Sequence, residues 1–166
     1  MADYGSLQAD LFADEQLSAG WEELIAGALT DLGTSVRVRI LPRRRSASDL
    51  QWLVLAALPL QAFLTGVGSN FADAAYKGFQ DAVRKLLHRE NAAGVARPMV
   101  LQDTGSGLQI VLEHDLPAEG YQQLLSLDLS RFRFGPLHYD RTEQRWRSEL
   151  DEAARPPDPP EDQPAT

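Results

Sequence analysis

Five arginines form the densest basic group in the sequence, and guanidinium chemistry makes them the candidate binding residues. They are Arg37, Arg39, Arg43, Arg44 and Arg45. Each guanidinium group carries its N–H donors in a planar fork that matches the oxygens of a carboxylate or a phosphate. The group could therefore meet an acidic protein segment, anionic lipid heads or a nucleic-acid backbone. A solvated strand face and loop would carry the same residues without binding a partner.

The charge of the whole chain narrows this choice. The 166 residues have a formal net charge of −8, which argues against nucleic-acid binding because phosphate neutralisation dominates that class of interaction. Residues 1–34 sum to −7, residues 35–90 to +5 and the remainder to −6. A basic middle between acidic ends favours a protein partner or self-association. A membrane surface is the less favoured partner, and we expect no small-molecule ligand and no cofactor.

The three histidines are the next residues that could do chemistry. His114 lies between Glu113 and Asp115, and His138 lies close to Asp140. Imidazole and carboxylate groups together are typical metal ligands, so these two segments could form a metal or acid–base site if they met in space. His88 is remote in sequence, and no His-x-x-x-His spacing is present. We therefore expect no metal site and predict solvent-facing histidines near strand ends.

One short motif carries a family resemblance. Asp103-Thr-Gly-Ser106 lies between two apolar segments and resembles the Asp-Thr-Gly signature of aspartic proteases. The resemblance implies an aspartate that shares a proton with a second such aspartate, and hence a small hydrolase. It covers only these residues, and Phe132-Arg-Phe-Gly135 is a poor match to the family's later supporting element. A β-hairpin turn requires the same residue types for conformational reasons.

The elements that would position these groups can be predicted from periodicity. Residues 1–13 are weakly patterned, and we expect them to be loose. A helix is predicted from Asp14 to about Asp31, where apolar residues recur at helical spacing. Residues 35–41 alternate with period two, which predicts a strand with Val36, Val38 and Ile40 facing the core and the arginines facing outward.

Residues 51–72 contain no ionisable side chain. Whether this segment is buried in a protein core or inserted in a membrane determines whether the protein is a globular or a membrane protein. The apolar part of the segment, residues 52–66, is predicted to be a helix bent at Pro59. Because a membrane span needs about 20 apolar residues, we expect a buried core helix. A second helix over residues 71–89 would pack against it as a helical hairpin.

The second half of the chain is predicted to contain two hairpins and a tail. Strands over residues 98–102 and 108–113 form the first hairpin, a short helix covers residues 117–125, and residues 138–147 form the second hairpin. Residues 127–134 are a further extended segment. Residues 149–166 are rich in proline and acids, which is typical of a disordered tail.

These observations predict a single α+β domain over residues 14–148, with a mostly antiparallel sheet packed against a central helical hairpin. The polar N-terminus lacks the order of a secretory signal, so a cytoplasmic location is expected. The arginine-rich composition favours a GC-rich bacterial genome. We expect a non-catalytic interaction module, an adaptor or subunit of a larger bacterial assembly in defence or signalling. The alternatives are a membrane-associated module that uses Arg43–Arg45 and the helix at 52–66, and a small hydrolase.

Overall fold

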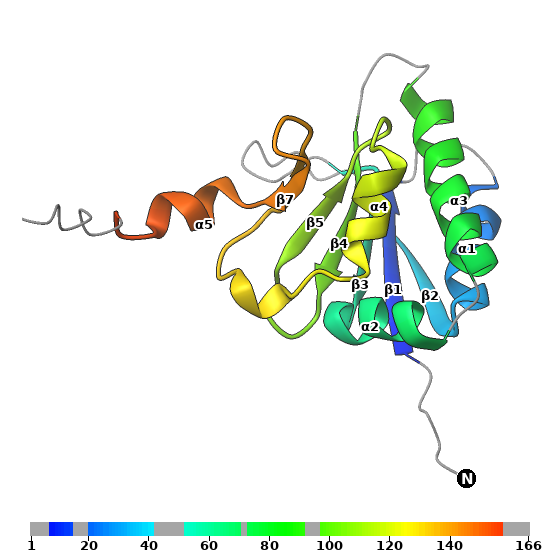
Figure 1. Ribbon diagram of the computed structural model, residues 1–166. Coiled ribbons are helices and arrows are strands. Elements are labelled where there is room, and N and C mark those ends of the chain that lie inside the picture. The colour runs from blue at the N-terminus through cyan, green and yellow to red at the C-terminus, as the bar shows by residue number, and fades with distance from the viewer. Residues whose placement is uncertain (1–6, 15–19, 42–51, 71–72, 92–96, 158–166) are drawn as a thin grey trace, which may run out of the picture.

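The computed structural model describes residues 7–14, 20–41, 52–70, 73–91 and 97–157 (Figure 1). These residues form an α+β fold, which confirms the predicted class. The strands are β1 (Leu7–Asp14), β2 (Thr34–Leu41), β3 (Val54–Leu58), β4 (Met99–Asp103), β5 (Gln109–Leu112), β6 (His138–Asp140) and β7 (Arg145–Arg147). The helices are α1 (Trp21–Asp31), α2 (Leu60–Asn70), α3 (Asp73–Asn91), α4 (Ala118–Leu124) and α5 (Glu149–Ala154), with a 3-10 turn at Leu129–Arg131.

Five strands form one mixed sheet in the order β2-β1-β3-β4-β5, and β6 and β7 form a separate hairpin. β1 pairs with β2, and β3 with β4, in parallel, whereas the β1–β3 and β4–β5 pairs are antiparallel. A parallel pair needs a crossover connection. α1 provides the first crossover, and α2 with α3 provides the second. The sheet therefore contains more parallel pairing than the sequence led us to expect.

The helices cover one face of this sheet. Leu11, Ala56, Leu101 and Ile110 point toward them and are fully buried in one apolar core shared with all four helices from α1 to α4. A smaller cluster of Leu55, Val100 and Val111 lies on the opposite face. The sheet therefore has a helix-covered face and a second face, which we call the open face, without a helix among the described residues (Figure 1).

The expectation of a loose N-terminus over residues 1–13 is wrong for residues 7–13, because residues 7–14 form β1 at the interior of the sheet, while residues 1–6 lie outside the described residues. The inward positions of β1 include Ala9 and Ala13, both buried, and alanine gives only a weak hydrophobic signal. The predicted helix also begins later than expected, at Trp21. Gly20 precedes it with φ 94°, a left-handed conformation that glycine adopts without steric cost.

The apolar run is two elements and not one helix. Residues 54–58 form β3, which lies between β1 and β4 and is buried on both faces. The sequence of such an interior strand is a continuous apolar segment, so hydrophobic periodicity does not distinguish it from a buried helix. Pro59 then stands directly before α2, where its missing N–H costs no helical hydrogen bond. Gly66 lies inside α2 instead of starting a turn.

The two helices of the expected hairpin follow each other in the chain but do not run side by side. α2 lies across the ends of the strands, whereas α3 runs along the sheet beside α1 (Figure 1). No helix in the described part of the chain is both long enough and apolar enough to cross a membrane.

The second half agrees with prediction in β4, β5, α4 and the β6–β7 hairpin. The extended segment expected at 127–134 is wrong in part, because Leu129–Arg131 is a 3-10 turn in which the Asp128 carboxylate accepts a hydrogen bond from the Ser130 amide. The tail expected from residue 149 begins instead with α5, capped by the side chain of Ser148. Residues 158–166 lie outside the described part of the chain.

Candidate functional site

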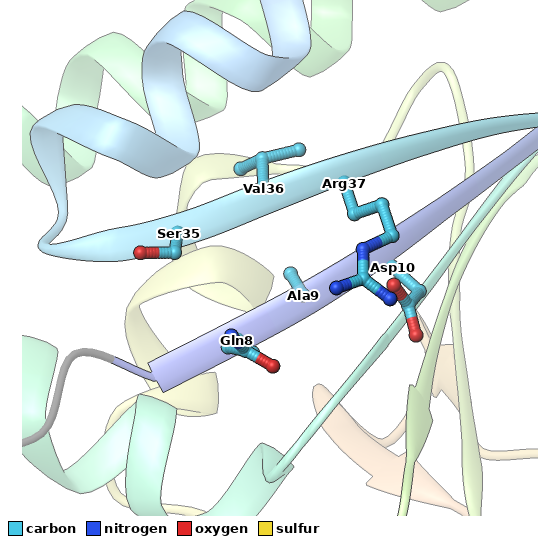
Figure 2. A pocket seen from close by; sticks show the side chains of 6 residues that line it. All are labelled: Gln8, Ala9, Asp10, Ser35, Val36 and Arg37. Atoms are coloured by element: carbon cyan, nitrogen blue, oxygen red, sulfur yellow. The ribbon is translucent and has the colours of Figure 1, made fainter.

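The candidate site is the outer edge of the sheet, which is formed by β2. On its inner side β2 pairs with β1. All eight residues of β2 pair with β1, from Thr34 opposite Leu7 to Leu41 opposite Asp14. Arg37 and Arg39 are exposed. Figure 2 shows Val36 pointing toward the helix layer, while Arg37 points away from it with Asp10 of β1 at its side. The strand thus presents the arginines on the open face, as the alternation predicted.

A small hollow lies on this edge between β1 and β2. Its volume is 140 Å³, and its lining residues are Gln8, Ala9, Asp10, Ser35, Val36 and Arg37 (Figure 2). Pockets that enclose a drug-sized molecule have volumes of roughly 300–1,000 Å³. The hollow is therefore too small to enclose a drug-sized molecule.

The electrostatics of this edge differ from those of the rest of the molecule. The ion pairs between described residues gather around β5, β6, β7 and α5, and neither Arg37 nor Arg39 takes part in one. Asp10 is the acid that pairs with Arg37 in the strand register. The predicted residues Arg43, Arg44 and Arg45 lie outside the described residues. The structure therefore places two of the five predicted arginines together on one strand.

One inward position of β2 departs from the prediction. Val36 and Val38 are half-buried against the core, as expected. Ile40 was expected to face the core as well, but 54% of its surface is exposed. It lies near the end of an edge strand, where few neighbours remain to cover a side chain. The edge therefore shows both charged and apolar groups to solvent.

The opposite edge of the sheet is closed by the chain itself. Leu137 N donates a hydrogen bond to Gln109 O at 2.8 Å, and Val111 N donates one to Leu137 O at 3.0 Å. The Leu137 side chain is fully buried. The segment before β6 thus pairs with β5 and satisfies backbone groups that would otherwise be free.

Asp103 lies in the β4–β5 hairpin turn, and its carboxylate is engaged on both oxygens. Oδ1 accepts from the Leu60 amide at 3.0 Å, and Oδ2 accepts from the Ser106 amide at 2.9 Å and from Ser106 Oγ at 2.7 Å. Partial burial alone would raise the pKa of Asp103, but these hydrogen bonds outweigh it and hold the pKa below the usual value. The aspartate joins the hairpin to the first turn of α2, which is a structural task.

The two histidine-containing segments do meet, though in separate pairs. His138 Nδ1 lies 3.9 Å from Glu113 Oε1, and Asp115 forms an ion pair of 2.6 Å with Arg141. The nearby His138 imidazole lowers the pKa of Glu113. His114 faces Asp115 at 4.0 Å. Among the described residues, no group of three or more His, Cys, Asp or Glu side chains could hold a metal ion.

Sequence reasoning missed the contribution of β1 to the site. Gln8 and Asp10 line the hollow beside Arg37, yet residues 1–13 showed no clear pattern. The signal that could have identified them is the alternation of Gln8, Asp10 and Phe12 with the small or apolar residues between them.

No family model, no curated protein and no solved structure matches this chain. The function is therefore argued from the chemistry of the site.

Proposed function

We propose that this chain is a non-catalytic protein-interaction module, an adaptor or subunit of a larger assembly, and that it binds its partner along β2. The observation that carries the proposal is the difference between the two edges of the sheet. β5 is paired with Leu137, whereas no described residue pairs with the outer side of β2. An edge strand offers unpaired N–H and C=O groups to another chain unless it is protected.

The roles of the acidic residues also favour binding over catalysis. Asp103 caps the start of α2, Asp128 caps the 3-10 turn, and Asp140 pairs with Arg147 in the C-terminal hairpin. Each of these carboxylates stabilises a turn or a hairpin. The small-hydrolase alternative would need one of them to be released from its hydrogen bonds.

The membrane alternative has less support than it had from the sequence. It depended on an apolar helix at residues 52–66, but that segment contains β3; its leucine, valine and phenylalanine side chains are buried between residues 53 and 64, and Trp52 is partly buried. Side chains in the core are not available to lipid. What remains of this alternative is the basic charge of the arginines.

Photo-crosslinking in cells that naturally produce the protein tests the proposed function. An apolar photoreactive amino acid replaces Ile40 on β2 in one variant and the exposed Phe134, near the other edge, in the matched control. We expect a discrete crosslinked protein band with the first variant and none with the control. The same bands from both positions, or none from position 40, would contradict the proposal.

A further inference from the structure

We infer that the partner docks as an extended acidic strand, supplied by another protein, whose residues alternate between carboxylate and apolar side chains. This inference rests on the proposed function, since it names the kind of segment that β2 receives. It is carried by the charge and the exposure of the residues along this edge. Each of the following features specifies one property of the partner.

The backbone of β2 sets the length and conformation of the partner. β2 runs for eight residues, Thr34–Leu41, without a break in its pairing to β1. At about 3.3 Å per residue it presents roughly 26 Å of edge. Alternate residues of an edge strand direct their N–H and C=O groups outward. A partner of about six to eight residues would add to the sheet as a further strand.

The arginines specify the side chains that the partner presents on the open face. Arg37 and Arg39 are two residues apart, so both project to the same face of the sheet. Both are exposed and form no ion pair with a described residue. Side chains directly opposite each other on paired strands interact, and opposite charges are favourable there. Carboxylates at every second position of the partner would meet both guanidinium groups.

The intervening residues specify the other face of the partner. Val36 and Val38 are half-buried beneath the helix layer, and Ile40 exposes 54% of its surface. Apolar side chains on the same face of the incoming strand would cover these three residues and remove apolar area from water. The partner pattern is therefore apolar, acidic, apolar, acidic, apolar.

Two nearer candidates fit the edge less well. In a two-fold pairing of two β2 strands, the arginines of both copies would share one face, and like charges in that arrangement repel. The acidic residues 158–166 of this chain include Pro159, Pro160 and Pro164. Proline lacks the N–H that a pairing strand must donate. A strand from a different protein avoids both problems.

A peptide of the sequence Thr-Val-Glu-Val-Glu-Val-Thr, acetylated, amidated and fluorescently labelled, tests the inference by fluorescence anisotropy with the full chain. We expect saturable binding that weakens as salt is added. The same peptide with glutamine in place of glutamate should bind about tenfold more weakly, since the two exposed ion pairs with Arg37 and Arg39 are lost. Equal binding of the two peptides would overturn the inference.

Backbone methylation separates strand addition from simple charge attraction. Two further peptides carry N-methyl groups on one or the other set of alternate amides. In strand pairing only one set faces β2, so one peptide should lose binding and the other should retain it. If both methylated peptides bind as the parent does, the contact is electrostatic and not a strand pairing, and the inference fails.

Protein variants locate the peptide on the molecule. The double variant Arg37→Gln/Arg39→Gln should bind the acidic peptide about tenfold more weakly. Arg131→Gln/Arg133→Gln removes the same charge from two other exposed arginines and should bind like the parent. Equal losses in both variants would overturn the inference. A β2-dependent dimer in sedimentation would overturn it in favour of a second copy.

The crosslinking and peptide experiments fail independently. If position 40 crosslinks a partner but the acidic peptide does not bind, the proposed function stands and the acidic-strand inference is wrong. If the peptide binds but position 40 crosslinks no protein in cells, the edge has the chemistry inferred here and the proposed function is wrong.

Discussion

The β5 edge and the β2 edge of the sheet differ in which side chains they carry and in how far those side chains are buried. At the β5 edge the chain returns on itself, with Leu137 fully buried and bonded to the backbone of Gln109 and Val111. At the β2 edge the outward groups are Arg37, Arg39 and the exposed part of Ile40. Closing an edge with buried apolar side chains stabilises the fold, whereas an edge with exposed charges contributes little to stability.

This difference separates the residues that maintain the fold from the residues to which the proposed function assigns partner binding. The closed edge is reinforced by the β6–β7 hairpin, where Arg147 joins Asp140 at 2.5 Å and Glu152 at 2.5 Å. Exposed arginines on an edge strand also discourage self-association. Substitutions at the closed edge should therefore change stability, and substitutions at the β2 edge should change binding.

The largest expected effect is at Leu137. Leu137→Ala removes a fully buried side chain and should lower the free energy of unfolding by about 2–5 kcal/mol. The matched change Ile40→Ala on β2, where 54% of the side chain is exposed, should cost about 1 kcal/mol or less. Urea unfolding measures both. Equal costs would break the comparison between the edges.

A smaller effect is expected from a glycine at the closed edge. A Cβ added at Gly135 would lie 3.2 Å from Gln109 N and 3.3 Å from Gln109 O. Because the obstacle is backbone, Gly135→Ala should destabilise the protein by about 1–3 kcal/mol. Gly78 in α3 has nothing within 4 Å of the same position, so Gly78→Ala should be neutral or stabilise by up to about 1 kcal/mol. Thermal unfolding should show a lower Tm for Gly135→Ala and an unchanged or higher Tm for Gly78→Ala, and equal shifts would refute the close packing at this edge.

The turn that leads into the closed edge should respond to pH. Asp103→Ala removes the acceptor for the Leu60 amide and for Ser106, at a cost of about 1–2 kcal/mol near neutral pH. Because the pKa of Asp103 in the folded protein is below its ordinary value of 3.8, its contribution is present above pH 3.8 and is lost as the pH falls further. Unfolding measured from pH 6 to about pH 2 should show the variant and the parent converging.

Asp81→Ala, on the exposed side of α3, is the control for that change. It should leave stability at neutral pH nearly unaltered, since alanine is a good helix former. A loss at Asp103 no larger than the loss at Asp81 would show that the hydrogen bonds of Asp103 do not stabilise the turn.

Sequence patterns predicted the β2 edge of the sheet more accurately than its centre. Arg37 and Arg39 alternate with valines. This period of two is visible in the sequence because one face of β2 is exposed to solvent and the other packs against the core. β3 is buried on both faces, so its apolar residues carry no alternation and were interpreted as a helix. β1 was missed because alanines occupy two of its inward positions. The pairing of Leu137 with β5 depends on contacts distant in sequence, which no local pattern reports.

The smallest predicted effect concerns the contact between Glu113, which follows β5, and His138 of β6. The nearby His138 imidazole holds the pKa of Glu113 below its ordinary value of 4.5. The stabilisation is therefore present above pH 4.5 and is lost as the pH falls below that value. Glu113→Gln should reduce stability at pH 6 by less than about 1 kcal/mol, because the pair is half-exposed and screened by salt.

Glu119→Gln on α4 is the matched control, and urea unfolding at pH 6 and pH 3 should separate the variants only at pH 6. If Glu113→Gln instead altered peptide binding and left stability unchanged, the closed edge would belong to the binding surface, and the division of roles between the two edges would be wrong.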